Sequence, residues 1–176
     1  MASSSDRAIG LSTTAFARIR QGLRTLSPAP PPPIPARLAA RLPEPVLTRW
    51  HALGSYDRRH LVAVASDLTA SAQPDHVVLA GLLHDIGKAG RVTIVDRVAH
   101  VLIGWIMPRM RARLAARSRP VPGLDGLHLL LRHAETGADL LEKTGMPAKV
   151  VWLVRHHEQP TEHPDLRALV AADHRH

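Results

Sequence analysis

A histidine and an aspartate stand side by side at the end of a strongly apolar stretch of the chain. The segment reads HVVLAGLLHDIGK, and the pair is His84 and Asp85. An imidazole nitrogen and a carboxylate oxygen both bind divalent metal ions, and the second carboxylate oxygen can bridge to another ion. Lys88 follows His84 by one helical turn, so we expect its ammonium to face an anionic ligand above the metal. The pair indicates a metal site, although a lone His-Asp pair is more often structural.

Further candidate ligands occur in other apolar segments, where an unpartnered imidazole would be costly. They are His60, His133, His156, His157 and Asp173. Their segments are separate predicted helices, so several helices are expected to bring nitrogen and oxygen ligands to one place. Helical bundles build two-metal sites in this way.

The elements that position these residues are predicted to be helices. Apolar residues make up 45% of the chain but aromatic residues only 3%, which favours packed helices over a β-sandwich. No segment alternates as a strand. Apolar spacing and prolines predict helices over residues 36–42, 45–53, 57–71, 75–87, 92–107, 109–118, 125–144, 147–158 and 164–173.

Acidic residues and glycines mark the expected ends of several of these helices. Asp57 and Asp75 fit N-caps or first helical turns. Gly87 and Gly145 fit C-terminal stops, where glycine adopts a conformation that other residues avoid.

The first 35 residues are interpreted as a basic, proline-rich N-terminal extension, and residues 36–176 as one domain. A short amphipathic helix is expected over 11–26. The following segment SPAPPPPIP (27–35) must break it, because consecutive prolines remove backbone donors and favour an extended conformation.

Composition restricts the possible chemistry and partners. The formal charge is +8, which is compatible with an anionic partner, although biased base composition of the gene is the favoured explanation of an arginine-rich chain. The chain has no cysteine, so a metal must use histidine and carboxylate. The longest apolar run, 98–107, is shorter than the ~20 residues that span a bilayer, so we expect no transmembrane segment and a cytoplasmic location. The basic run at 109–119 fits an electrostatic collar for a nucleotide, RNA or anionic membrane, or simply a solvated helix.

The order and spacing of these residues resemble the HD-domain phosphohydrolase superfamily, in particular its HDIG-type, two-metal branch. The resemblance runs from about Leu38 to Asp173. It rests on five elements: His60, the His84-Asp85 pair with Gly87 and Lys88, His133 four residues before Gly137, His156-His157-Glu158, and Asp173. It implies an all-α HD-domain helical bundle with a dinuclear metal site.

The resemblance also implies a role for each candidate residue. One metal ion is expected among His60, His84, Asp85 and Asp173. Asp85 would bridge to a second ion held by His133 and by His156, His157 or both. The expected ions are Mn or Fe, with Mg and Ni as alternatives. A hydroxide between the ions would attack phosphorus, Lys88 would hold a phosphoryl oxygen, and Arg132 or Arg155 could assist.

The implied activity is hydrolysis of a phosphomonoester or phosphodiester, with a small anionic substrate such as a nucleotide; nucleic acid is a less favoured partner. The sequence QPTEHP after His157-Glu158 lacks the Gly-Tyr-Pro signature of cyclic-di-GMP phosphodiesterases. The stretch AGRVTIVD after Lys88 lacks the Glu-Asp pair of ppGpp hydrolases. Two alternatives stay open, a diiron oxygenase of the same superfamily and a regulatory module that keeps metal without turnover. Oligomeric state is left open as well.

Overall fold

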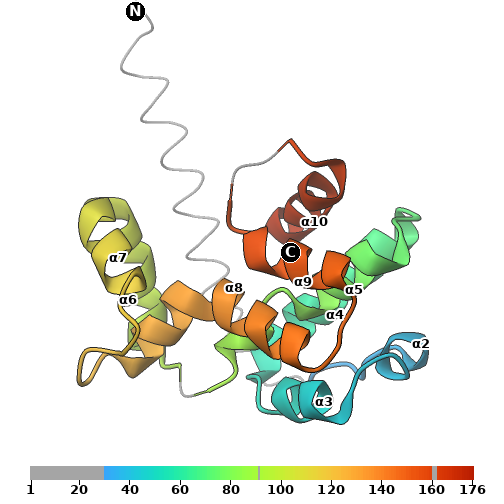
Figure 1. The fold of residues 1–176 in the computed structure, drawn as a ribbon, viewed down its shortest axis with the longest axis horizontal. Coiled ribbons are helices and arrows are strands. Elements are labelled where there is room, and N and C mark those ends of the chain that lie inside the picture. The colour runs from blue at the N-terminus through green and yellow to red at the C-terminus, as the bar shows by residue number, and fades with distance from the viewer. Residues whose placement is uncertain (1–29, 91, 160–161) are drawn as a thin grey trace, which may run out of the picture.

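All regular secondary structure in the described part of the chain is helical. The computed structural model describes residues 30–90, 92–159 and 162–176, and within them it contains no strand (Figure 1). The expectation of an all-α fold is confirmed. The helices are α2 (Ala36–Ala39), α3 (Glu44–His51), α4 (Ser55–Ala70), α5 (Asp75–Leu83), the 3-10 helix η1 (Ile86–Lys88), α6 (Ile94–Ile106), α7 (Pro108–Ala115), α8 (Asp125–Lys143), α9 (Ala148–His156) and α10 (Pro164–Arg175).

Prolines begin many of these helices. Pro43, Pro74 and Pro147 immediately precede α3, α5 and α9, and Pro108 and Pro164 are the first residues of α7 and α10. Proline is suited to these positions because its φ is already helical and the first turn of a helix does not use its backbone donor. The local sequence therefore sets where most of the helices start.

Several expected helices end earlier than predicted, and three of them by three or more residues. The helix expected over 109–118 ends at Ala115. The helix expected over 36–42 ends at Ala39. The helix expected over 75–87 ends at Leu83, because Asp85 adopts φ −101° and ψ 10° and the chain then forms η1. The helix expected over 11–26 lies outside the described residues.

Helix α5 lies at the centre of the fold. All seven residues from Val77 to Leu83 are buried, and α5 contacts α4, α9 and α10. A helix that is apolar on every side is stable only when other helices surround it. The core continues from α5 into α2, α3 and α4 and into the C-terminal half of α8, where Ala138 and Leu141 are fully buried.

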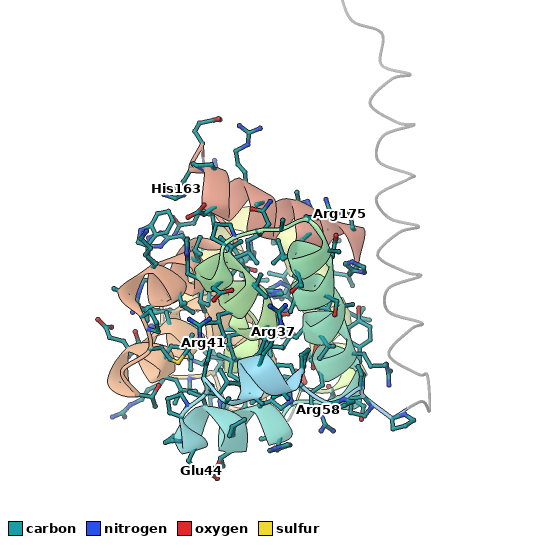
Figure 2. The ribbon with its side chains drawn as sticks, turned by 90° about the vertical axis from the view of Figure 1, so that its right-hand side faces the viewer. Arg37, Arg41, Glu44, Arg58, His163 and Arg175 are labelled. Atoms are coloured by element: carbon teal, nitrogen blue, oxygen red, sulfur yellow. The ribbon has the colours of Figure 1, made fainter. Side chains whose placement is uncertain are left out.

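Exposed ion pairs connect the surrounding helices. Arg41 on α2 contacts Asp75 at the start of α5 at 2.7 Å, and Arg175 at the end of α10 contacts Asp67 on α4 at 2.8 Å. Both arginines are labelled in Figure 2, where α2 lies across the lower end of the bundle and Arg175 lies at its upper edge. Exposed pairs of this kind contribute at most about 1 kcal/mol each. Burial of the apolar core therefore carries most of the stability.

Helices α6 and α7 lie outside this core, against the N-terminal half of α8. Thr93 and Asp96 form a capping box at the start of α6. The Asp96 carboxylate also lies directly against Gly126 at the start of α8, where any larger side chain would overlap it. The two helix N-termini are thereby held together.

Candidate metal centre

The end of the central helix places His84 and Asp85 in the interior. His84 is 1% and Asp85 4% exposed. Because α5 stops at Leu83 and the backbone turns at Asp85, the two consecutive side chains project into the same region rather than a helical step apart. Four other helices then supply side chains around them.

Six of the seven predicted ligands come together in two groups of three. His60, His84 and Asp173 form the first group, and Asp85, His133 and His157 form the second. Within each group, the candidate ligand atoms all lie within 4.8 Å of one another.

In the first group, Oδ1 of Asp173 lies 2.8 Å from Nε2 of His60 and 3.3 Å from Nε2 of His84. In the second group, Oδ1 of Asp85 lies 3.1 Å from Nε2 of His133 and 3.8 Å from Nε2 of His157.

The Asp85 carboxylate connects the two groups. Its Oδ1 belongs to the second group, and its Oδ2 lies 3.7 Å from Nε2 of His84 in the first group. One carboxylate thus faces both sets of imidazoles, as a bridging ligand would.

Backbone contacts determine which nitrogen each imidazole presents to the cluster. Nδ1 of His84, His133 and His157 lies 3.0, 2.7 and 2.7 Å from the carbonyl oxygen three residues earlier in the chain. A carbonyl oxygen only accepts, so Nδ1–H is the donor in all three. The neutral imidazoles therefore present the lone pair of Nε2 to the cluster, as metal-binding histidines do.

This arrangement brings acceptors against acceptors. Nε2 of His133 and Nε2 of His157 are 3.1 Å apart. Nε2 of His84 and Oδ1 of Asp85 are both buried without a hydrogen bond. Buried lone pairs that converge in this way repel one another unless a proton or a metal ion lies among them. The donor set of imidazole and carboxylate fits Mn, Fe, Ni or Zn-type ions better than an all-oxygen site would.

The pKa shifts of the clustered side chains reflect the same close approach of lone pairs and negative charges. Burial lowers the pKa of His157 to about 3, with the neighbouring His84 adding to the effect, so this imidazole is neutral at pH 7. Burial would also lower the pKa of His84, but the carboxylates of Asp85 and Asp173 outweigh burial and raise it. Burial would raise the pKa of Asp85, yet Lys88, with His84 and His133, holds it well below its usual range.

Lys88 lies inside the cluster rather than above it. Its Nζ donates a 2.6 Å hydrogen bond to Oδ2 of Asp85. Burial would lower the pKa of Lys88, but Asp85, with Asp57 and Asp173, raises it, so the ammonium stays charged. The sequence predicts for Asp57 only a role as an N-cap or first-turn acid. Asp57 is only 4% exposed. Its position three residues before His60, on the same side of the helix, is the sequence signal that could have identified it as part of the site.

The two consecutive histidines at the end of α9 are separated by the fold. His157 enters the second group. Nδ1–H of His156 donates to the carbonyl of Trp152 at 2.7 Å, and the His156 ring stacks on the Trp152 indole with centroids 4.8 Å apart. The sequence left open whether one or both bind metal, and the structure brings only His157 to the cluster.

The arginines near the site also differ from expectation. Arg132 contacts Glu135, and Arg155 contacts Asp139 and Glu142, so both guanidinium groups pair with acids of α8. Two residues without a role predicted from the sequence lie at the rim of the cluster.

Those rim residues are Glu158 and Arg111. Oε1 of Glu158 lies 3.9 Å from Nε2 of His133, and Arg111 of α7 lies 3.7 Å from Oε2 of Glu158. A cationic side chain from α7 is therefore present beside the cluster.

Two glycines allow η1 to touch α8. A Cβ atom on Gly87 would lie 2.0 Å from the carbonyl oxygen of His133, and one on Gly137 would lie 3.1 Å from the backbone nitrogen of Gly87. The sequence predicts that Gly87 ends a helix in the left-handed conformation, but its φ is not in that region. Its lack of a side chain instead allows this close packing. This contact brings Asp85 and His133 within reach of each other.

A comparison with known protein families gives one match. The family model described as HDOD domain matches residues 60–160 of the chain, a span that contains His60, both residues of the His84-Asp85 pair, His133 and His157. Searches of curated proteins and of solved structures found no match.

Proposed function

Because the chain belongs to the HDOD domain family, an HD-like family that bears out the resemblance stated above, we propose that its His/Asp cluster holds two divalent metal ions and that the protein hydrolyses a phosphomonoester or phosphodiester. The first ion would be held by His60, His84 and Asp173 and the second by His133 and His157. Asp85 would bridge them. Mn or Fe suits this donor set best, with Mg and Ni as alternatives.

The observation that supports this proposal most directly is the orientation of the imidazoles. Three of them donate Nδ1–H to backbone carbonyls, so three Nε2 lone pairs converge on two carboxylates. Burying these imidazoles and carboxylates together has a desolvation cost, which a metal ion would offset and a purely structural role would not require. The ions, when bound, would supply Lewis acidity and activate water.

The chain's own residues would then orient and stabilise the substrate. Lys88 is charged and partly buried beside Asp85, where an ammonium can bind a phosphoryl oxygen and stabilise charge that develops there. Arg111 at the rim adds a second cation for an anionic substrate. Together with the +8 charge of the chain, these side chains favour a nucleotide or another small phosphate ester. A cytoplasmic location stays a prediction.

The first test is metal analysis of protein purified without oxygen, followed by a screen of nucleotides and generic phosphodiesters with Mn, Fe, Mg and Ni. Asp85→Ala should lose both ions and activity, because the two sites lose their shared anion and the cations repel each other. Lys88→Ala should keep the ions and lose ~10²–10³-fold in turnover.

The screen also separates the alternatives. Full metal content and full activity in Asp85→Ala would refute the two-metal hydrolase. Two bound irons, oxygen uptake with an organic substrate and no phosphate release would establish the oxygenase. We also expect cyclic-di-GMP not to be the preferred substrate, and its turnover well above other phosphodiesters would contradict this.

A regulatory module is the second candidate, because HDOD proteins are often regulatory and because Lys88 already pairs with Asp85. In a module of this kind, metal or the internal ion pair would hold the fold without turnover. Wild-type protein that binds two ions, and hydrolyses none of the esters with any of the four metals, would favour this reading.

A further inference from the structure

A continuous apolar stripe runs along the exposed side of α6. Val95, Val98, Leu102 and Ile106 are 75, 52, 46 and 65% exposed. At 3.6 residues per turn these four side chains fall within about 80° of one another around the helix. We call this set the α6 stripe. Scattered exposed aliphatic side chains are common on proteins, but an aligned set of four on one helix indicates a contact surface.

Helix α7 and the residues that flank it add further apolar side chains and unpaired positive charge. Met107 and Met110 are 49 and 40% exposed. In the described chain no carboxylate pairs with the exposed arginines of this region, which are Arg109, Arg113, Arg117 and Arg119. From Arg97 to Leu124 the sequence contains six arginines and no acidic residue.

We propose that the α6–α7 hairpin docks on the surface of a membrane rich in anionic lipid. The α6 stripe would enter the boundary between headgroups and acyl chains, and the four exposed arginines in and after α7 would contact the lipid phosphates. Apolar side chains flanked by basic ones bind such surfaces by adding apolar burial to electrostatic attraction. Long arginine side chains reach the headgroups while their stems stay on apolar surface.

The position of the hairpin in the fold suits this role. Helices α6 and α7 contact each other and lie at one end of the longest axis of the molecule, away from α4, α5 and α10 (Figure 1). Among the described residues, no helix combines the length and the apolar character needed to cross a bilayer. The proposed contact is therefore with the membrane surface.

Two other occupants fit the surface less well. Nucleic acid would use the arginines but leave the aliphatic stripe in water, and the basic run at 109–119 contains no aromatic residue for stacking on bases. A second copy of the chain would cover the stripe, but a two-fold interface would bring the unpaired arginines of two copies together. An anionic membrane would bury the apolar stripe and also pair with the positive charge of the arginines.

Sedimentation with lipid vesicles tests the proposal on the full chain. We expect partitioning into vesicles of phosphatidylcholine with phosphatidylglycerol and not into phosphatidylcholine alone. Binding should weaken as salt is raised from ~0.1 M to ~1 M, since the screening length falls from about 10 to 3 Å. Leu102→Ser with Ile106→Ser, and separately Arg109→Glu with Arg113→Glu, should each lower partitioning by about ten-fold or more.

Matched controls lie elsewhere on the surface. Trp152 on α9 is a large apolar side chain that is 38% exposed, and Arg167 on α10 is an exposed arginine. Trp152→Ser and Arg167→Glu should leave partitioning nearly unchanged. Circular dichroism and metal content should show that every variant keeps its fold.

A dye attached at a single position distinguishes docking through the α6 stripe from non-specific binding to vesicles. The chain has no cysteine, so Val98→Cys and Arg167→Cys each accept one environment-sensitive dye. The dye at position 98 should shift to the blue with anionic vesicles, and the dye at position 167 should not. Equal binding to zwitterionic vesicles, RNA binding without vesicle binding, or stripe-dependent dimerisation without vesicle binding would each overturn the proposal.

Discussion

At the residue scale, the tautomers of three histidines are the most informative feature. Each of His84, His133 and His157 commits Nδ1–H to a backbone carbonyl, which fixes the orientation of its ring before any ion arrives. Preorganised ligands of this kind raise metal affinity because no conformational freedom is lost on binding. Asp85 gains its importance from position, since its two oxygens face different groups.

The consecutive histidines of α9 provide a sharp test at this scale. His157→Ala should lower the affinity of the second metal site by at least about 10–100-fold, because the remaining ligands cannot replace a buried imidazole. His156→Ala should leave metal affinity unchanged, since His156 stacks on Trp152 outside the cluster. Titration calorimetry with Mn²⁺ measures both. An equal loss in the two variants would show that His156 turns inward to bind metal.

At the element scale, the contact between η1 and α8 aligns the two halves of the centre. Gly87 and Gly137 allow backbone to meet backbone, and interiors packed this closely do not accept an additional methyl group without displacement. The position of Asp85 relative to His133 therefore depends on a residue that has no chemistry of its own.

Gly87→Ala should lower the free energy of unfolding by about 1–3 kcal/mol and also weaken metal binding, because a Cβ atom would lie 2.0 Å from the His133 carbonyl oxygen. Gly145→Ala is the matched control. Gly145 ends α8 with φ +75° and no atom near its absent Cβ, so alanine there should cost about 1 kcal/mol without affecting metal affinity. Urea unfolding and calorimetry separate the two effects. Normal metal affinity in Gly87→Ala would contradict this role.

At the scale of the whole molecule, the candidate metal centre is buried in the bundle around α5, and the α6–α7 hairpin lies outside the apolar core. Helix α8 joins them, since its C-terminal half lies in the core and its N-terminal half supports the hairpin. Arg111 links the hairpin to the rim of the centre through Glu158. A contact made by the hairpin could therefore reach the cluster through Arg111 and Glu158 alone.

The N-terminal boundary can be tested by truncation. Residues 1–35 remain an expected extension. Ile34 is partly buried against the core, so a truncation that keeps Ile34 should be more stable than one that removes it. Protein that begins at Pro30 should keep the metal stoichiometry and melting temperature of the full chain. Protein that begins at Ala36 should keep its metal but lose about 1–2 kcal/mol of stability through the loss of Ile34. A collapse of the Pro30 protein would show that the preceding residues pack on the core.

The sequence by itself determined the helices and most of the candidate ligands. Apolar spacing and proline positions act locally, so the starts of α5, α9 and α10 at Asp75, Ala148 and Pro164 lie within one residue of expectation. The His84-Asp85 pair was visible because an ionisable pair after an apolar helix is unusual in itself. The family match agrees with the resemblance drawn from these residues.

Only the tertiary structure decided which side chains meet. His156 and His157 differ by about 100° around a helix, and nothing in their own sequence says which of them faces α8. Asp57 and Lys88 are distant in the chain, so their electrostatic coupling arises from the packing of α4 against α5. The contact of Arg111 with Glu158 likewise depends on where α7 lies. These features come from long-range packing, which local spacing does not encode.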